Sequence, residues 1–243
     1  MRSILIVLFL VTVIIVLLPV MLFELVFRQF NREASEIHCQ YIARTVMKVI
    51  DFLAGMQLTV KGSENIPKDE AVLYVPNHRG AFDYTSVVTT LPVPVFFVGK
   101  ADFLKIPFFG VWVYLVGTLL LKRESLKEGL KVVLDAIEKV KAGKSVIIFP
   151  EGTRNKGDIL EPAKFKEGSF KIAVKSGCRI IPVAITGTRE IFERQAPIVK
   201  SGKVTLAFGE PIDPKTLAPE DVKRIGAYTR EKIIEMLKKE ADQ

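Results

Sequence analysis

The feature that most constrains this chain is an uncharged apolar run near its N-terminus. Residues 3–23 read SILIVLFLVTVIIVLLPVMLF, without one charged side chain. As an α-helix this run would be ~32 Å long, close to the ~30 Å hydrocarbon core of a bilayer. It is longer than the apolar core of a secretory signal, and no small-residue cleavage pattern follows it. We therefore expect an uncleaved membrane anchor.

A second helix of different character is expected after this run. Between residues 42 and 56 apolar residues recur at spacings of three and four with charged residues between them, the pattern of an amphipathic helix. Two arrangements fit. The first segment spans the bilayer while the second packs on the domain, or both form a hairpin that dips into one leaflet, with Pro19 assisting the bend.

The flanking charges indicate a side of the membrane. Cations lie mostly on the C-terminal side of the apolar run, at Arg28, Arg32 and Arg44, against Arg2 on the other side. The positive-inside rule then places the rest of the chain on the cytoplasmic face of the cell membrane, anchored by residues 1–56.

Residues 57–243 alternate between short apolar segments and helical patterns, which is typical of an α/β fold. Ser125, with Glu128 three residues later, has the form of a helix N-terminal cap. Several strand candidates are apolar on both faces, which favours a buried sheet. We predict one α/β domain with a central, largely buried mixed sheet of about seven strands flanked by helices. The expected strands are 57–60, 71–75, 95–98, 117–121, 145–149, 180–185 and 204–208, and the expected helices are 82–91, 107–114, 125–141, 167–176 and 219–239.

Composition narrows the class of partner. The net charge of +8 indicates an anionic partner, which is a nucleic acid, an anionic lipid or a phosphorylated substrate. Two cysteines cannot form a disulfide framework, and two histidines add few ligands for zinc. We expect no metal and no cofactor.

Polar residues follow two of the predicted strands. His78 and Asp83 lie in the segment NHRGAFD between a strand and a helix, where α/β folds bind ligands. An aspartate can orient an imidazole and leave its other nitrogen as a general base. The segment FPEGTR comes at the end of the predicted strand 145–149 in the same way. Cations that suit a phosphate lie at Lys105, Arg123 and Arg154.

Taken together, these segments resemble the sequence blocks of the glycerolipid acyltransferases, the 1-acylglycerol-3-phosphate acyltransferase family. NHRGAFD resembles the family's N-H-x4-D block, and FPEGTR resembles its F-P-E-G-T-R block. Residues 117–123 resemble a G-x5-R block, and residues 181–185 resemble an apolar proline block. The order and spacing agree over roughly residues 57–210.

The resemblance implies transfer of an acyl chain from acyl-CoA or acyl carrier protein to the sn-2 hydroxyl of 1-acylglycerol 3-phosphate (lysophosphatidic acid), giving phosphatidic acid. It implies that His78 is the general base, that Asp83 orients it, and that an anionic phospholipid membrane is a partner. Backbone N–H groups near Gly80 or Gly152 are candidates to stabilise the oxyanion. The implied substrate-binding residues are Lys105, Arg123, Glu151, Gly152, Thr153 and Arg154.

Other functions remain open from sequence. The acceptor could be another lysophospholipid or glycerol 3-phosphate. A membrane-bound thioester hydrolase would use the same His78 and Asp83. A basic protein that binds anionic lipid or nucleic acid would explain the charge, but not why His, Asp, Glu and Arg follow buried strands; we expect no nucleic acid as a partner.

Overall fold

The order of the strands decides which loops of this protein meet. In the computed structural model, which describes residues 1–122 and 125–241, the strands form one sheet in the order β1-β7-β6-β2-β5-β3-β4. The strands from β6 to β4 are mutually parallel, whereas β7 is antiparallel to β6 and parallel to β1. The predicted mixed sheet is confirmed. The strands are β1 (Met56–Lys61), β2 (Leu73–Pro76), β3 (Val95–Lys100), β4 (Leu119–Leu121), β5 (Ser145–Ile147), β6 (Ile180–Thr186) and β7 (Gly202–Phe208).

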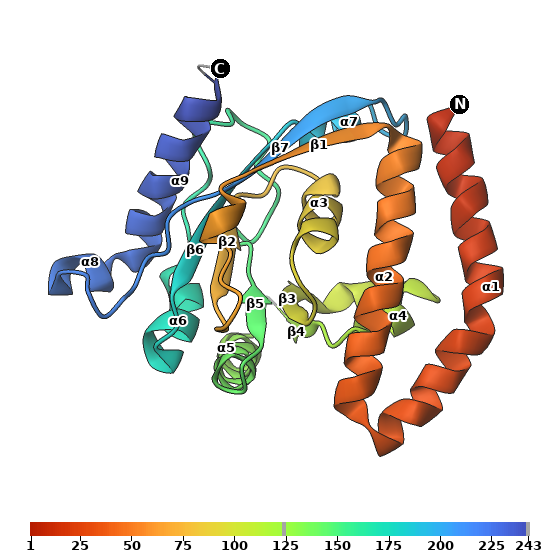
Figure 1. The fold of residues 1–243 in the computed structure, drawn as a ribbon, viewed down its shortest axis with the longest axis horizontal. Helices are drawn as coiled ribbons and strands as arrows, with labels where there is room; N and C mark the ends of the chain where they lie inside the picture. The colour runs from red at the N-terminus through yellow and green to blue at the C-terminus, as the bar shows by residue number, and fades with distance from the viewer. Residues whose placement is uncertain (123–124, 242–243) are drawn as a thin grey trace.

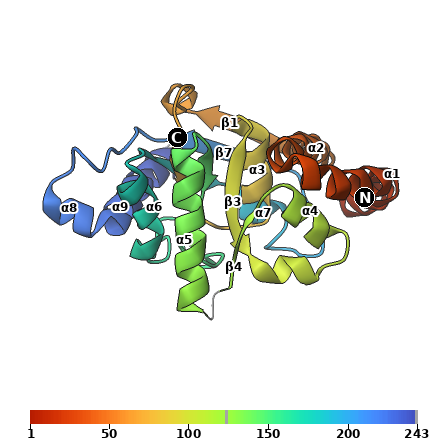
Figure 2. The same ribbon diagram turned by 90° about the horizontal axis from the view of Figure 1, so that it is seen from below.

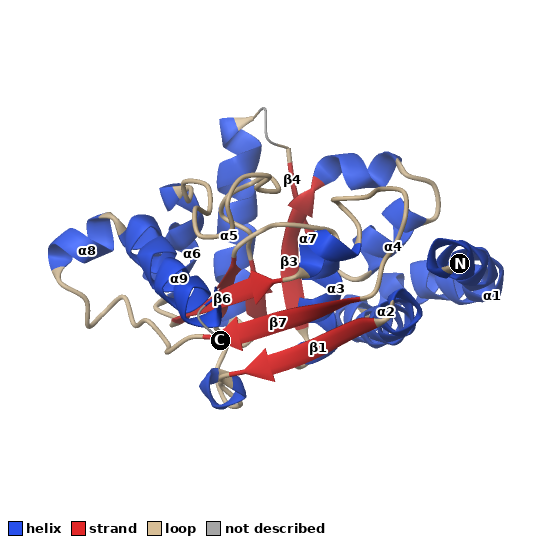
Figure 3. Ribbon diagram, turned by 90° about the horizontal axis from the view of Figure 1, so that it is seen from above, coloured by secondary structure: helices blue, strands red, loops and turns tan. Residues whose placement is uncertain are grey.

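Helices cover both faces of the sheet (Figures 2 and 3). On one face lie α5 (Leu126–Lys141), α6 (Lys171–Ser176) and α9 (Ile225–Ala241), and on the other lies α3 (Phe82–Thr90). The remaining short helices are η1 (Ser63–Asn65), η2 (Ala101–Lys105), α4 (Phe109–Leu115), η3 (Glu167–Phe170), α7 (Thr188–Ile191) and α8 (Pro219–Lys223).

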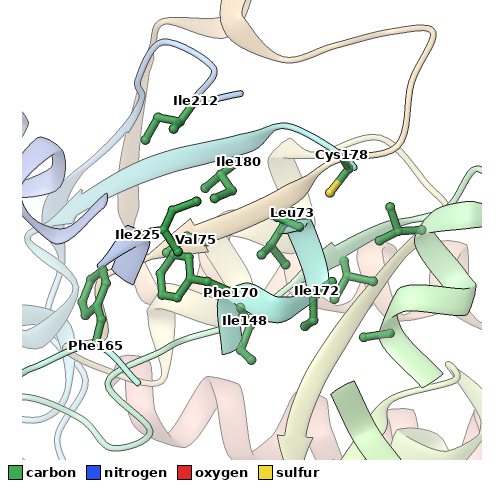
Figure 4. Close-up of a cluster of buried hydrophobic side chains, with 14 of the residues drawn as sticks. Leu73, Val75, Ile148, Phe165, Phe170, Ile172, Cys178, Ile180, Ile212 and Ile225 are labelled. Carbon is green, nitrogen blue, oxygen red and sulfur yellow. The ribbon is translucent and has the colours of Figure 1, made fainter. Parts of the chain in front are cut away.

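The apolar strands of the sheet are buried on both faces, as their sequence predicts. Along β2, Leu73 and Val75 belong to the core cluster beneath α5, α6 and α9, part of which is shown in Figure 4. Tyr74, between them, belongs to the cluster beneath α3. Because successive side chains of a strand point to opposite faces, a strand covered on both sides has no polar alternation.

A helical hairpin precedes the sheet (Figure 1). It consists of α1 (Arg2–Phe30) and α2 (Arg32–Ala54), joined at Asn31, whose side chain accepts a hydrogen bond from Ala34 N at 3.0 Å. Among the described residues, α1 is the one helix long and apolar enough to cross a membrane. The chain therefore reverses at Asn31 and not at Pro19, which lies inside α1.

Both ends of α1 are attached to the rest of the protein. At its N-terminus, Arg2 Nη1 donates to Leu53 O at 3.1 Å, and Val199 N donates to Ser3 Oγ at 2.8 Å. At its C-terminal end, Arg28 pairs with Glu36 of α2 at 3.0 Å. The hairpin thus lies along the domain, as Figure 1 shows.

Glu36 also fixes the hairpin to the sheet domain. Its carboxylate pairs with Arg32 at 2.8 Å and with Lys139 of α5 at 2.7 Å. The Lys139 ammonium in turn lies 3.8 Å from the centre of the Phe96 ring in β3. This ion cluster joins three elements that are far apart in sequence.

The seven predicted strands are all present, and the structure differs from the prediction mainly in its helices. The helix expected at 219–239 is broken near Arg224 into α8 and α9, and the helix expected at 167–176 begins as the 3₁₀ helix η3, which contains Gly168. The short helix α7 was not expected, because four residues are too few to show a helical period.

Candidate active site

The candidate site lies at the edge of the sheet where β2, β5 and β6 end. These three strands are parallel neighbours, with β2 in the middle, so the segments that follow them meet. His78 and Asp83 follow β2, Glu151 follows β5 and Thr188 follows β6. This is the position at which open α/β sheets bind ligands.

His78 and Asp83 form a hydrogen-bonded pair. Nδ1 of His78 lies 2.8 Å from Oδ2 of Asp83. Asp83 is fully buried, whereas the His78 side chain is 20% exposed. Because the carboxylate accepts from Nδ1–H, the neutral imidazole has its lone pair on Nε2. The ring of Phe149 supports the imidazole, with ring centres 4.4 Å apart.

Further donors hold the Asp83 carboxylate from all sides. Oδ2 also accepts from the backbone N–H groups of Arg79, at 2.5 Å, and Gly80, at 2.8 Å. Oδ1 accepts from the hydroxyl of Thr188 at 2.5 Å, and Thr188 is itself fully buried. None of these donors carries a formal charge when His78 is neutral. The carboxylate thereby shapes the loop that carries the histidine.

Asn77 attaches this loop to β6. Its side-chain amide donates to Ile185 O at 3.0 Å, and its side-chain carbonyl accepts from Ile185 N at 2.7 Å. The amide therefore extends the β2–β6 pairing by one residue and fixes the point at which the chain turns toward His78.

Glu151 lies beneath the same loop. Oε1 accepts from the backbone N–H of His78 at 2.6 Å, and Oε2 accepts from Ala163 N at 2.8 Å. Burial raises the pKa of Glu151, while the two backbone hydrogen bonds act in the opposite direction. Both of its oxygens are thus bonded to backbone, which connects the loops after β2 and β5.

Gly152, Thr153 and Arg154 form the turn that follows. Gly152 has φ 72°, and a Cβ there would lie 2.9 Å from Lys166 Nζ, so glycine suits this position. Thr153 and Arg154 are exposed. Arg154 Nη1 lies 3.4 Å from Oε1 of Glu193.

Two backbone N–H groups considered as oxyanion donors are already engaged. Gly80 N donates to Asp83, as described above, and Gly152 N donates to Phe149 O at 3.0 Å. In this structure both of these N–H groups are thus bonded within the protein, and the expectation of oxyanion donors near Gly80 or Gly152 stays a prediction.

The other two predicted cations are placed differently. Lys105 lies on η2, after β3, at the same edge of the sheet but two strands from β2, and it pairs with Asp102 at 2.8 Å. Arg123 lies outside the described residues.

Sequence reasoning missed two residues at this edge, Thr188 and Glu193. Thr188 follows a buried strand, so the rule that singled out His78 and Glu151 could have found it. Glu193 has no such signal. Its Oε1 accepts from Ala81 N at 2.7 Å, at the start of α3, and it also faces Arg154.

The described residues contain no cluster of three or more His, Cys, Asp or Glu side chains arranged to hold a metal ion. The site as described is thus built from an oriented imidazole and a nearby arginine. Such a pair can take a proton from a hydroxyl group while a cation binds an anionic part of the same molecule.

Known proteins are similar to this chain in sequence and in fold. The family model described as Acyltransferase matches residues 57–186. The 1-acyl-sn-glycerol-3-phosphate acyltransferase of Borreliella burgdorferi is 33% identical over 195 residues, covering 80% of this chain and 77% of the other. That of Escherichia coli K12 is 27% identical over 223 residues, covering 86% and 89%.

A solved structure agrees over nearly the whole chain. The crystal structure of the 1-acyl-sn-glycerophosphate acyltransferase of Thermotoga maritima superposes with a TM-score of 0.72 at 28% identity, covering 98% of this chain and 97% of the other. The similarity thus includes the hairpin as well as the sheet. From the match to more than half of its residues and from these relatives, this chain belongs to the acyltransferase family, and it is an enzyme.

Proposed function

We propose that this enzyme transfers an acyl chain from an acyl thioester, on CoA or on acyl carrier protein, to the sn-2 hydroxyl of 1-acylglycerol 3-phosphate. The product is phosphatidic acid. The observation that carries the proposal is the hydrogen bond between His78 and the buried Asp83, which leaves Nε2 of the imidazole as a base. The names of the curated relatives support the choice of acceptor.

The reaction then follows from the geometry around His78. Nε2 removes the proton from the acceptor hydroxyl while its oxygen attacks the thioester carbonyl carbon. The tetrahedral intermediate collapses, the carbon–sulfur bond breaks, and the imidazolium returns the proton to the leaving thiolate. Asp83 holds the imidazole in its tautomer and stabilises its protonated form, as in a catalytic triad in which the substrate alcohol replaces the serine.

Arg154 is our candidate for the acceptor phosphate. It is exposed beside the His78 loop, and a guanidinium can bind phosphate through two parallel hydrogen bonds. Lys105 would add a cation from the same edge of the sheet, and Arg123, which lies outside the described residues, stays a candidate from its sequence alone. Gly152 and Thr153 would face the glycerol, and Glu151 would act indirectly, by holding His78 N and Ala163 N.

Residues 1–56 would anchor the acyltransferase domain, residues 57–243, to the membrane. Of the two arrangements open from sequence, the hairpin in one leaflet is better supported, because both ends of α1 contact the same body. A spanning helix would have to break the contacts of Arg2 and Ser3. The cations on the C-terminal side of the apolar run favour the cytoplasmic face of the membrane. An anionic bilayer suits the net charge of +8.

The experiment that tests the function uses the purified full chain in mixed micelles with lysophosphatidic acid and each thioester in turn. Products are read by lipid mass spectrometry, beside the His78→Ala variant. Phosphatidic acid formed by the wild type and lost in the variant supports the reaction and identifies the donor. Product with glycerol 3-phosphate or another lysophospholipid alone would change the acceptor, and fatty acid released without any acceptor would indicate a hydrolase.

A second comparison tests the phosphate contact. Arg154→Ala should raise the KM for the acceptor by about tenfold or more, since a charge-assisted hydrogen bond contributes ~1.5–3 kcal/mol. Arg194→Ala is the matched control, because Arg194 is an exposed arginine paired with Glu190. Arg189, another nearby arginine, would not serve as the control, since its Nη1 donates to Lys156 O and holds the neighbouring loop. Equal effects of the two substitutions would contradict the assignment.

A further inference from the structure

An exposed apolar surface lies on the segment between β3 and α4, outside the site just described. We call it the loop surface and define it by Phe103, Leu104, Ile106 and Phe109, which are between 38% and 48% exposed. None of the other exposed large apolar residues of the described domain from residue 57 onward lies in this short stretch; they are Val60, Tyr114, Leu130, Leu134, Val174 and Ile198. Tyr114 is explained by Arg28, which lies 4.4 Å from its ring centre. A cluster of exposed apolar side chains marks an interaction surface.

A tight turn at Phe108 shapes the loop surface. Phe108 has φ 60°, a conformation that a bulky side chain rarely adopts, and Phe109 N donates to Pro107 O at 2.6 Å across it. Gly110 N donates to Ile106 O at 2.8 Å. A Cβ on Gly110 would lie 2.6 Å from Leu104 O, so only glycine lets η2 pack this closely on α4. A costly backbone that turns apolar side chains toward solvent points to a function for them.

The same turn joins the loop surface to the anchor helix. Phe108 points inward and packs with Trp112 in a cluster that includes Leu17 and Met21 of α1. Figure 2 shows α4 beside the hairpin, and α1 and α4 are in contact. This cluster therefore connects the segment that carries the loop surface to α1, on which Ile14 and Leu18 are also exposed.

Charge at the loop surface fits a lipid headgroup region. Lys100 precedes the apolar residues and Lys105 lies among them, and each pairs with Asp102. The Lys105 side chain is 81% exposed. Lysines beside aromatic and aliphatic side chains are typical of segments that lie in a membrane interface.

We propose that the loop surface is a second bilayer contact, which inserts beside α1 into the same leaflet. The segment follows β3, whose C-terminal end lies at the same edge of the sheet as His78. Contacts at both α1 and the loop surface would hold this edge of the sheet against the membrane. The acceptor would then reach His78 from the leaflet. The inference rests on the proposed function for its purpose, but its test does not need enzymatic activity.

The test uses selective labelling. Both native cysteines, Cys39 and Cys178, are buried, so a new exposed cysteine can be labelled alone with an environment-sensitive fluorophore. The full chain carrying Ile106→Cys is mixed with phosphatidylglycerol–phosphatidylethanolamine vesicles that contain brominated lipid. Leu8→Cys on α1 is the positive control, and Val174→Cys on α6 is a matched exposed apolar position on another side of the domain.

We expect blue-shifted emission and quenching by brominated lipid at positions 8 and 106, and neither at position 174. Quenching at position 8 without quenching at position 106 would overturn the second contact while leaving the anchor. Absence of quenching at both positions would overturn the membrane arrangement altogether. Equal quenching at position 174 would mean that the protein contacts lipid non-specifically, and would also overturn the proposal.

A functional arm separates membrane contact from substrate binding. The Ile106→Ser/Phe109→Ser variant should lose about tenfold in acyl transfer to lysophosphatidic acid in vesicles, since each buried apolar side chain contributes on that scale. Transfer to a short-chain acceptor dissolved as monomers should stay near the wild-type rate. Equal losses on both acceptors would place these residues in the substrate site and overturn the proposal. If the wild type transfers to neither acceptor, the proposed function fails and the labelling result alone decides this inference.

Discussion

Asp83 and Glu36 are two buried carboxylates that are held in opposite ways. Asp83, in the candidate active site, receives its hydrogen bonds from two backbone N–H groups, a hydroxyl and an imidazole. Glu36, at the base of the hairpin, receives them from Arg28, Arg32 and Lys139. The first carboxylate is held by neutral donors and the second by cations.

The difference matches what each region has to do. A carboxylate whose hydrogen bonds come from neutral donors forms no ion pair through them, so it can stabilise a proton that arrives on His78 during a reaction. A carboxylate surrounded by cations has its charge already compensated, and it serves to hold the elements that carry those cations. We therefore expect changes around Asp83 to affect rate, and changes around Glu36 to affect stability.

The largest effect is expected at His78. His78→Ala should lower the rate of acyl transfer ~10²–10⁴-fold, because general-base catalysis contributes on that scale. The measurement is kcat with saturating donor and acceptor, with folding checked by circular dichroism. His38→Ala is the matched control, since His38 is also paired with a carboxylate, Glu24, but lies on α2. A folded His78→Ala variant with a near-normal rate would remove His78 from the mechanism.

Glu36→Gln should cause the largest loss of stability. The substitution leaves the buried Arg28 and the largely buried Lys139 without their counter-charge. Such a loss typically costs ~3–5 kcal/mol, and for a chain of this length the melting temperature should fall by roughly 6–20 °C. Glu33→Gln is the control, because the Glu33 side chain, which pairs with Lys144, is 61% exposed. Below its unfolding transition, the Glu36 variant should keep its kcat. A large loss of kcat in the folded variant would contradict the division of roles between the two carboxylates.

The pH dependence of the free energy of unfolding tests the role of Glu36 in a second way. Burial alone would raise the pKa of Glu36, but its hydrogen bonds with Lys139 and Arg32 outweigh burial and lower the pKa below its ordinary 4.5. The stability that ionised Glu36 contributes is therefore present above pH 4.5 and is lost as the pH falls through the lower, folded-state value. Chemical denaturation from pH 7 downward should show the difference between wild type and Glu36→Gln shrinking in acid.

Asp51 sharpens the comparison as a buried carboxylate with few donors of either kind. It lies between α2 and α3 with a 3.4 Å contact from the Thr89 hydroxyl, and its Oδ1 has no partner. Burial raises its pKa to about 6. The folded state then binds more protons than the unfolded state between about pH 4 and 6, so ionised Asp51 destabilises the fold above pH 6.

Asp51→Asn removes that cost. Relative to wild type, the variant should gain up to about 3 kcal/mol of stability at pH 7, and the gain should disappear below about pH 4. Urea unfolding at the two pH values measures it. A gain of equal size at both pH values would show that ionisation is not the cause.

The sheet and its helices could be predicted because their physical signals are local. Each strand is a short apolar run between turn residues, and Ser125 caps α5 by accepting from Glu128 N, as its spacing predicts. The attachment of the hairpin could not be predicted. The pairing of Glu36 with Lys139 and of Ser3 with Val199 joins residues that lie about one hundred or more positions apart, and no periodicity reports such contacts.

Only those residues of the candidate site that carry a local sequence signal could be predicted. His78 and Glu151 are visible because each follows a buried strand, and the topology then brings β2 and β5 together. The roles of their neighbours depend on contacts. From sequence, Glu151 is expected to bind the acceptor, whereas in the structure its oxygens accept from backbone N–H groups. Glu193 meets Ala81 N because α7, which it follows, packs against α3. That placement of α7 depends on tertiary packing, which a single sequence does not encode in any short pattern.

The smallest expected effect concerns Thr188, which tests whether the neutral donors around Asp83 matter individually. Thr188→Val removes the hydroxyl that donates to Oδ1 and leaves a buried carboxylate oxygen without a partner. Such a loss costs ~1–3 kcal/mol, and if about half of it appears in the transition state, kcat should fall by about 2–13-fold while the KM for the acceptor changes little. Thr188→Ser keeps the donor and should restore most of the rate. Thr229→Val is the matched control, since it removes another fully buried hydroxyl, bonded to Ile225 O in α9, away from the site. If Thr188→Val and Thr229→Val lose stability equally and neither loses rate, then the backbone N–H groups of Arg79 and Gly80 suffice to hold Asp83. The difference between Asp83 and Glu36 would then be that backbone N–H groups hold the first carboxylate and a cluster of cations holds the second.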